Sequence, residues 1–195
     1  MSTNSPSQTP VGKPTAERRM MRLLGALALT AVLGAIITTA GVISSSGPAT
    51  AAKAITRTAV PGGFPISGAV AVPAGSDVVY LSGMTGGVVN PDAPKGSVEA
   101  YGDTATQTVN TLKKIQAALA EQKLTMGDVV MMHVYLVGDA AHEGKMDFAG
   151  MMSGYTQFFG TADQPNKPAR TTVQVAGLAG PGLLVEIEVI AAHAP

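Results

Sequence analysis

The sequence contains no cysteine and no tryptophan, and aromatic residues make up only 4% of it. Without cysteine the chain can form no disulfide and no thiolate metal site, and it has no thiol nucleophile. Charged residues account for only 13% of the 195 positions. Small residues and methionine must therefore fill much of the core, and a charge placed inside a strand needs an explanation.

Acidic and basic residues are unevenly divided along the chain, although the formal net charge is zero. Residues 1–54 hold five basic residues and one acidic residue. From Ile55 onward there are 8 basic and 12 acidic residues, a net charge of −4. This mildly acidic part argues against a nucleic-acid partner, because binding to phosphates needs clustered lysine and arginine.

The N-terminal part reads as an export segment. Residues 1–22 are rich in serine, threonine and proline and end in a basic cluster containing Arg18 and Arg19, which predicts a disordered, basic n-region. Residues 23–54 hold an uncharged apolar run at 23–43 and then small residues that allow cleavage after Ala51 or Ala54. This order is typical of a secretory signal, with a loose similarity to the twin-arginine type.

The same apolar run is long enough to cross a bilayer. An uncleaved anchor at 23–43 is therefore the alternative, and its positive flank would remain on the inner side. Translation from an internal methionine would instead leave the protein in the cytoplasm. The signal and the anchor both place the folded part outside the cytoplasm. We therefore expect an exported protein, periplasmic or secreted, with a membrane-anchored form as the alternative.

Residues 58–195 predict one α+β domain with two helices on one face of a mixed sheet. The expected elements are a hairpin of strands at 69–72 and 78–82, a helix at 104–122, a strand at 129–137, a helix at 147–159 capped by Asp147, and two strands within 168–192. Helices on one face leave the other face uncovered. A second subunit is the economical cover for a domain of this size.

The stretch PARTTVQVAGLAGPGLLVEIEVIAA, residues 168–192, places one arginine and two glutamates in otherwise apolar strands. Alternation along a strand predicts that one face of the second strand meets the helices: Leu183, Val185, Ile187, Val189 and Ala191. It also predicts that the polar side chains lie together on the opposite face: Arg170, Thr172, Glu186 and Glu188. Charges buried there by a second subunit must pair or bind something.

Two interpretations of these charges are open. The first is a cross-strand Arg–Glu pair or a solvated edge. The second is a binding site, in which Arg170 presents a planar fork to a carboxylate and Thr172 donates one more hydrogen bond. A glutamate one strand away can hold or deprotonate a water molecule there.

The stretch also resembles the C-terminal signature of the RidA family, also called YjgF, the reactive-intermediate deaminases. That signature is Pro-Ala-Arg-(Ser/Thr)-x-Val-x-Val-x-x-Leu, a turn, and then (Val/Ile)-Glu-Ile-Glu-x-Ile-Ala. The similarity extends through VVYLSGM, QTVNTLKKI, MGDVVMMHVYLV and YTQFF and covers about residues 64–192. It implies a chorismate-mutase-like α+β fold and a homotrimer with active sites between neighbouring subunits.

The resemblance further implies hydrolysis of reactive 2-enamine and 2-imine acids, such as 2-aminoacrylate and 2-iminopropionate, to a 2-keto acid and ammonia. The arginine that binds the substrate carboxylate falls on Arg170, and the glutamate that places the attacking water falls on Glu186. Thr172 stands where the family often has cysteine. The backbone at Ser82 and Gly83 would line the same cleft. We expect no cofactor.

Three positions depart from the family pattern. Ile66 replaces a substrate-site tyrosine, Met152 replaces an asparagine and Met84 replaces a glutamine. These changes keep a second function open, a non-enzymatic trimer on the same fold that binds small carboxylates or acts as a chaperone through methionine-rich surface. Replacing Arg170 by alanine would distinguish the enzyme from the chaperone, because the enzyme needs this side chain and the chaperone does not.

The histidines give weaker signals. His133 lies in the middle of a predicted strand, and we expect a core or interface histidine there. His142, Glu143 and Asp147 stand close together in the sequence, but Asp147 is better explained as a helix N-cap. We therefore expect no metal site.

Overall fold

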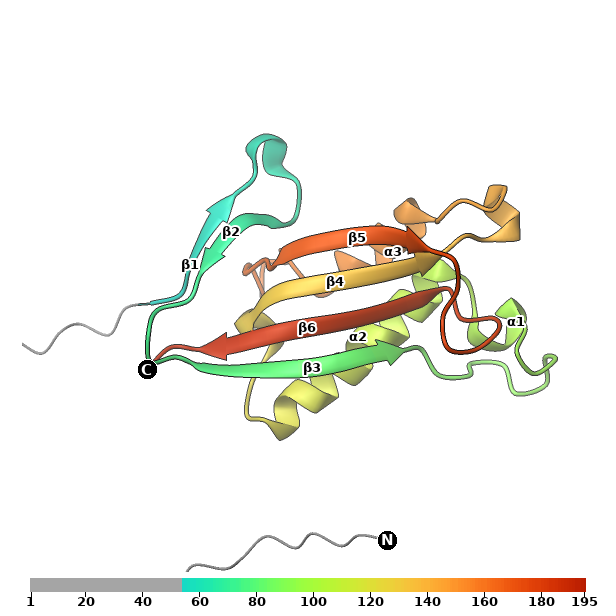
Figure 1. The fold of residues 1–195 in the computed structure, drawn as a ribbon, viewed down its shortest axis with the longest axis horizontal. Coiled ribbons are helices and arrows are strands. Elements are labelled where there is room, and N and C mark those ends of the chain that lie inside the picture. The colour runs from blue at the N-terminus through green and yellow to red at the C-terminus, as the bar shows by residue number, and fades with distance from the viewer. Residues whose placement is uncertain (1–53) are drawn as a thin grey trace, which may run out of the picture. The chain divides into compact units, whose positions relative to one another are not determined.

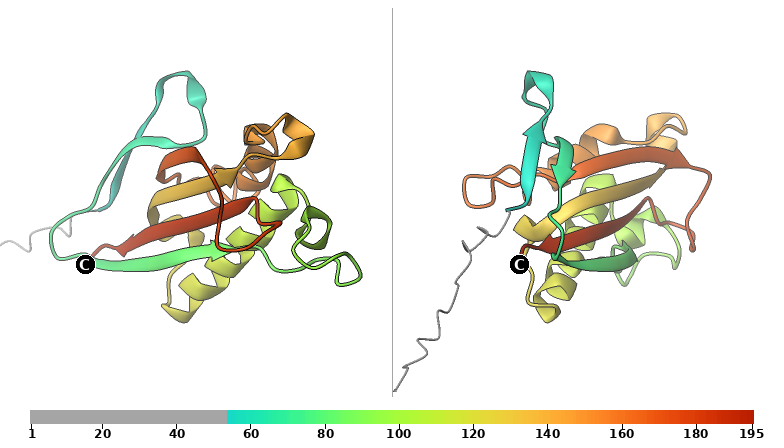
Figure 2. Two further views of the ribbon diagram at one scale, coloured as in Figure 1. Left: turned by 45° about the vertical axis from the view of Figure 1, so that its right-hand side comes forward. Right: turned by 60° about the vertical axis from the view of Figure 1, so that its left-hand side comes forward.

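The computed structural model describes residues 54–195. They form a six-stranded mixed sheet in the order β1-β2-β5-β4-β6-β3, and the two longer helices cover one face of it (Figures 1 and 2). The elements are β1 (Thr56–Ala59), β2 (Ser67–Ala71), β3 (Asp77–Thr85), α1 (Val98–Tyr101), α2 (Thr104–Glu121), β4 (Val129–Val137), α3 (Phe148–Tyr155), β5 (Ala169–Val175) and β6 (Val185–His193). The predicted α+β class is confirmed.

The predicted n-region and nearly all of the predicted signal or anchor region lie outside the described residues. Within residues 54–195, no helix combines the length and the apolar character that a membrane crossing requires.

The core lies between α2 and the sheet. On α2, Leu112, Ile115 and Leu119 recur at helical spacing and are fully buried. On β6, every second residue from Val185 to Ala191 is buried, and the alternate side chains are not. The prediction that this face of β6 meets the helices is confirmed from Val185 to Ala191, whereas Leu183 lies before β6 and is only partly buried. Each buried aliphatic side chain of this size contributes about 2 kcal/mol.

Aspartate side chains begin both longer helices. Asp103 accepts a hydrogen bond from the backbone N–H of Thr106 at 2.8 Å, and Asp147 accepts one from Gly150 at 2.8 Å. The prediction of Asp147 as an N-cap is confirmed. A cap of this kind stabilises a helix by about 1 kcal/mol.

The strands β2 and β3 do not form the predicted hairpin. β2 pairs with β1 and, through Ser67 and Ala169, with β5. β3 pairs along its length with β6 at the other edge of the sheet. The hairpin prediction is wrong because β2 pairs instead with β1, a strand that the sequence pattern does not predict, while β3 finds a partner of its own length in β6.

A buried glutamine fixes the entrance to β6. The Gln107 side chain on α2 donates to the carbonyl oxygens of Gly102 and Gly182 and accepts from the backbone N–H of Leu184. Gln107 is fully buried, so these bonds form in a medium of low dielectric. They hold the chain just before Glu186.

Candidate functional site

The register of the sheet decides which face Arg170 occupies. β4 lies between β5 and β6. Arg170 pairs with Met132 of β4, and Met132 pairs with Val189 of β6. Met132 and Val189 are buried beneath the helices, and residues paired in register share a face. Arg170 therefore lies on the helix-covered face.

The glutamates lie on the opposite, open face of the sheet. Glu188 is in register with His133, and Glu186 is in register with Tyr135. The prediction that Arg170 and Thr172 share a face with these glutamates is wrong. One face of β5 carries only polar side chains, those of Arg170, Thr172 and Gln174, so the sequence of β5 by itself favours the wrong face for contact with the helices. Its register with β4 shows which face meets them.

Arg170 lies among aromatic rings that we call the aromatic cage, Phe64, Phe148 and Tyr155. Its guanidinium carbon is 4.4 Å from the Tyr155 ring centroid, 5.7 Å from that of Phe64 and 5.9 Å from that of Phe148. Phe64 and Phe148 stack on each other at 6.5 Å. Contacts of this kind hold a cation by attraction to the ring faces.

One side of α3 supplies most of these contacts. Phe148, Met152 and Tyr155 are spaced four and three residues apart, so they lie along one helix face. Met152 contributes its sulfur, which accepts a hydrogen bond from Nη2 of Arg170 at 3.2 Å. The aromatic cage and Met152 together fix the position of the guanidinium.

Two donors beside the cage have no internal partner. Nη1 of Arg170 and Oγ1 of Thr172 are buried and make no hydrogen bond within residues 54–195. Leaving a buried donor unpaired costs about 1–3 kcal/mol. The two residues are adjacent on one face of β5. A ligand with two acceptor oxygens, such as a carboxylate, would satisfy both donors.

Burial shifts the ionisation of both Arg170 and Tyr155. It lowers the pKa of Arg170, and the neighbouring Tyr155 raises that pKa in part. An arginine remains charged despite such a shift. Burial also raises the pKa of Tyr155 to about 12. The pair is therefore a cation above a neutral phenol, which suits the binding of an anion.

Ile66 belongs to a segment fixed beside the cage. The hydroxyl of Tyr155 donates to the carbonyl of Pro65 at 2.9 Å. The backbone N–H of Ser67 donates to the carbonyl of Pro168, just before β5, at 2.9 Å. These bonds hold Phe64 and Ile66 near the start of β5, and Ile66 packs against the core. Position 66 is thus close to the predicted carboxylate site.

Ser82 and Gly83 form a β-bulge on the open side of the sheet. Leu81 pairs with Val189 and Met84 pairs with Ile187, so β3 has one extra residue between these pairs. The Glu186 side chain lies directly against Gly83, where a Cβ atom would overlap its carboxylate. The structure therefore brings Gly83 and Glu186 together.

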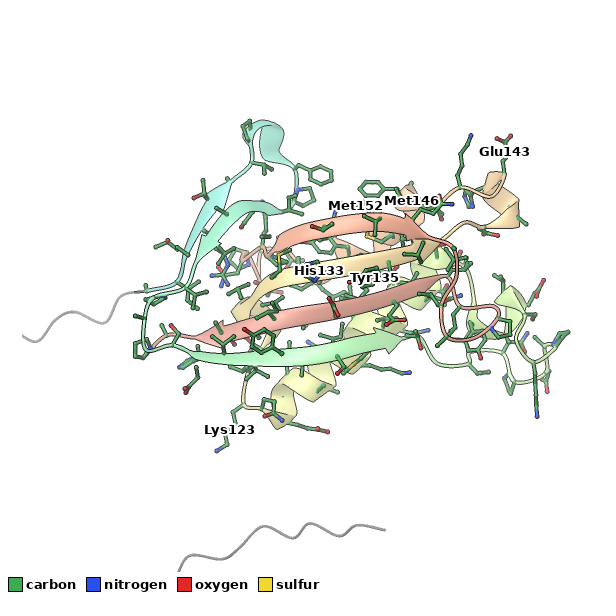
Figure 3. All side chains as sticks on the ribbon, in the orientation of Figure 1. Lys123, His133, Tyr135, Glu143, Met146 and Met152 are labelled. Atoms are coloured by element: carbon green, nitrogen blue, oxygen red, sulfur yellow. The ribbon has the colours of Figure 1, made fainter. Side chains whose placement is uncertain are left out.

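Glu188 has partners of its own on the open face. Its Oε1 lies 2.9 Å from Nδ1 of His133 and accepts a hydrogen bond from the Tyr135 hydroxyl at 3.1 Å. His133 and Tyr135 both belong to β4 (Figure 3). The hydrogen bond to Glu188 raises the pKa of Tyr135. Together with Ser82, His133 and Glu188 line a hollow of about 230 Å³.

The predicted cross-strand Arg–Glu pair is wrong. The strands that carry Arg170 and the glutamates are not neighbours, and the side chains lie on opposite faces of the sheet. In this chain the structure joins Arg170 with Thr172 on one face and Glu186 with Gly83 on the other. The α3 spacing was a usable signal for Phe148 and Tyr155. Nothing local in the sequence pointed to Phe64.

Of the residues weighed as metal ligands, His142 lies 3.8 Å from Asp147 and 3.5 Å from Asp139. Glu143 pairs instead with Lys145 at 3.4 Å. In the part of the chain that the structure describes, no three or more histidine and carboxylate side chains form a group that could hold a metal ion.

The match to a family model covers nearly all of the folded part. The model described as endoribonuclease L-PSP matches residues 64–193. The chain belongs to this family, RidA/YjgF. A RutC family protein of Pyrococcus horikoshii is 36% identical over 101 residues, which are 52% of this chain and 71% of that protein.

Solved structures of the RidA/YjgF family are similar as well. The Rid family protein YyfB of Yersinia pestis is 25% identical, covers 67% of this chain and 88% of its own, and has a TM-score of 0.51. A Mycobacterium tuberculosis member of the YjgF family is 28% identical, covers 72% of this chain and 100% of its own, and has a TM-score of 0.44. The Yersinia likeness agrees with the α+β fold described above.

Proposed function

We propose that this RidA/YjgF protein hydrolyses reactive 2-enamine and 2-imine acids to 2-keto acids and ammonia, outside the cytoplasm, at sites between the subunits of a homotrimer. The observation that carries this proposal is the pair of unpaired buried donors on β5, Nη1 of Arg170 and Oγ1 of Thr172. A substrate carboxylate would accept hydrogen bonds from both. The aromatic cage would hold the arginine in place.

The reaction follows from the groups on the two faces. The bound enamine takes up a proton on carbon and gives up one from nitrogen, which converts it to its tautomer, the imine. A water molecule, held and deprotonated by Glu186, adds to the carbon of the C=N bond. The nitrogen takes up protons and leaves as ammonia, and the C=O bond of the keto acid forms. Imine hydrolysis is already fast in water, so the protein need supply only about 4–8 kcal/mol.

The position of Glu186 requires a second copy of the chain. Arg170 and Glu186 lie on opposite faces of one sheet, and a small substrate cannot touch both through the packed core. A site that contains both groups would use Arg170 of one subunit and Glu186 of the next. The open face, with Tyr80 74% and Val173 41% exposed, is the surface that such a neighbour would cover.

The charge of the folded part favours this reaction over the RNA cleavage that the family's description as an endoribonuclease suggests. Residues from Ile55 onward carry a net charge of −4, and Glu186 and Glu188 both lie on the open face. RNA binding requires the opposite sign. The replacement at Ile66 favours one second candidate, a trimer that binds small carboxylates or acts as a chaperone without turnover.

The test uses 2-iminopropionate made in situ from alanine by an amino-acid oxidase, with ammonia release as the readout. We expect Arg170→Ala to lower kcat/KM by about 100-fold, mainly through KM, because a charge-assisted ion pair is lost. Arg57→Ala is the matched control, because Arg57 is also partly buried but bonds to the carbonyl oxygens of Gly127 and Val129.

A second pair of variants tests the base. Glu186→Gln should lower kcat by about 100-fold or more. Glu188→Gln changes the same residue type two positions along the same face and should have a much smaller effect. No acceleration by folded, assembled wild-type protein would reject the deaminase function and favour the carboxylate-binding trimer. Equal losses in the two glutamine variants would reject the role of Glu186.

A further inference from the structure

Arg170 has a sulfur atom as a neighbour. Nη2 donates to Sδ of Met152 at 3.2 Å. A thioether is a weak acceptor, so this contact leaves the guanidinium available to a stronger one. Met152 is labelled in Figure 3 close to β5, the strand that carries Arg170.

We propose that Met152 is an oxidation site, and that its sulfoxide closes Arg170 to carboxylate ligands. The inference deepens the proposed function, because it rests on Arg170 as the group that binds the substrate. Reduction of the sulfoxide would reopen the site. The result is a reversible switch in a chain without cysteine.

The chemistry needs a two-electron oxygen donor such as hydrogen peroxide. One peroxide oxygen bonds to the Met152 sulfur as the O–O bond breaks. The sulfur loses two electrons, and the other oxygen leaves as water. The new oxygen is a strong, polar acceptor, bonded to an atom that is already 3.2 Å from Nη2. It can therefore take a charge-assisted hydrogen bond and compete with the substrate carboxylate.

Solvent exposure and contact with Arg170 decide which methionine could act as the switch. Met151, Met132 and Met126 are buried, at most 5% exposed, and are shielded from a dissolved oxidant. Met84, Met131, Met146 and Met152 are partly exposed, so all four can react. Of these four, Met152 is the one whose sulfur accepts a hydrogen bond from Arg170. Met146→Leu is therefore a matched control for Met152→Leu, since each removes one reactive sulfur near the same end of the fold.

The experiment treats the full-length protein with hydrogen peroxide and maps the added oxygen by peptide mass spectrometry. Binding of pyruvate, a small 2-keto acid, is measured by calorimetry before and after treatment. We expect oxidation at Met152 to weaken binding about tenfold, the equivalent of one charge-assisted hydrogen bond. Methionine sulfoxide reductases should restore it. Met146→Leu should respond as wild type does, whereas Met152→Leu should bind equally well before and after peroxide.

Three results would overturn the proposal: loss of binding in peroxide-treated Met152→Leu, unchanged binding after Met152 is shown to be oxidised, or no oxidation at Met152. The ¹⁵N resonance of the Arg170 side chain gives a readout that needs no ligand. It should shift on oxidation in wild type and Met146→Leu but not in Met152→Leu, and no shift would also reject the switch. Absent deaminase activity with intact, peroxide-sensitive pyruvate binding would reject the proposed function and leave the switch standing.

Discussion

Tyr155→Phe removes one hydroxyl from beneath Arg170 and leaves the ring in place. That hydroxyl donates to the carbonyl of Pro65 at 2.9 Å, and Tyr155 is only 1% exposed. The variant loses this hydrogen bond and leaves the Pro65 carbonyl unpaired. We expect the free energy of unfolding near neutral pH to fall by about 1–2 kcal/mol.

The alkaline limb of the stability profile should change in the opposite sense. Burial raises the pKa of Tyr155 to about 12, whereas an unfolded tyrosine ionises near about 10. The folded state thus holds the phenol proton more tightly. This contribution is fully present below the unfolded pKa and is lost as the pH rises through the folded pKa. Two pH units of difference correspond to about 2.7 kcal/mol lost between roughly pH 10 and 12.

Phenylalanine cannot ionise, so the variant should lack this part of the alkaline loss. Urea unfolding followed by circular dichroism at a series of pH values measures both effects. The wild-type protein should be the more stable one near neutral pH, and the gap should shrink or reverse towards about pH 12. Parallel profiles for the two proteins across the alkaline range would refute the burial of the phenol, and with it the geometry of the aromatic cage.

Two further predictions concern the site itself. Ile66→Tyr should raise kcat/KM for 2-iminopropionate several-fold, because the tyrosine hydroxyl can add about one hydrogen bond to the substrate. Ile66→Phe is the control for ring size. Equal values of kcat/KM for the two variants would mean that position 66 offers the substrate no hydrogen bond. Arg170→Ala and Glu186→Gln, each nearly inactive alone, should regain activity when refolded together, at about one quarter of the sites by random assortment in a cyclic trimer. Mixed trimers, identified by mass spectrometry, that show no recovery would contradict a site shared between subunits.

The elements with a strong, regular pattern could be predicted from the sequence. The strand predicted at 129–137 coincides with β4, and the helix predicted at 104–122 is one residue longer than α2. Both have one face that is fully buried. Local alternation and helical spacing therefore suffice to predict where these two elements lie in the sequence and which of their faces is buried. The same holds for β6, whose apolar face packs against the helices as predicted.

Pairing between distant strands could not be predicted in the same way. The sequence of β5 does not show that β4 separates it from β6, nor that Arg170 is in register with the buried Met132. Which side chains of β5 face the helices therefore depends on its pairing with β4, a strand more than 30 residues earlier in the sequence. Phe64 is a similar case, because it reaches Arg170 only after β2 has paired with β5 through Ser67.

The separation of Arg170 and Glu186 limits how a single chain could act. Each group is fixed on its own side of the sheet, Arg170 by the aromatic cage and Glu186 by its contact with Gly83. Side-chain rotation cannot bring them together, because the backbone layer and the core lie between them. In a cyclic assembly every subunit presents both surfaces, so each contact between neighbours could complete one site. We therefore expect changes that separate the subunits to remove activity while each subunit stays folded and retains its cage around Arg170.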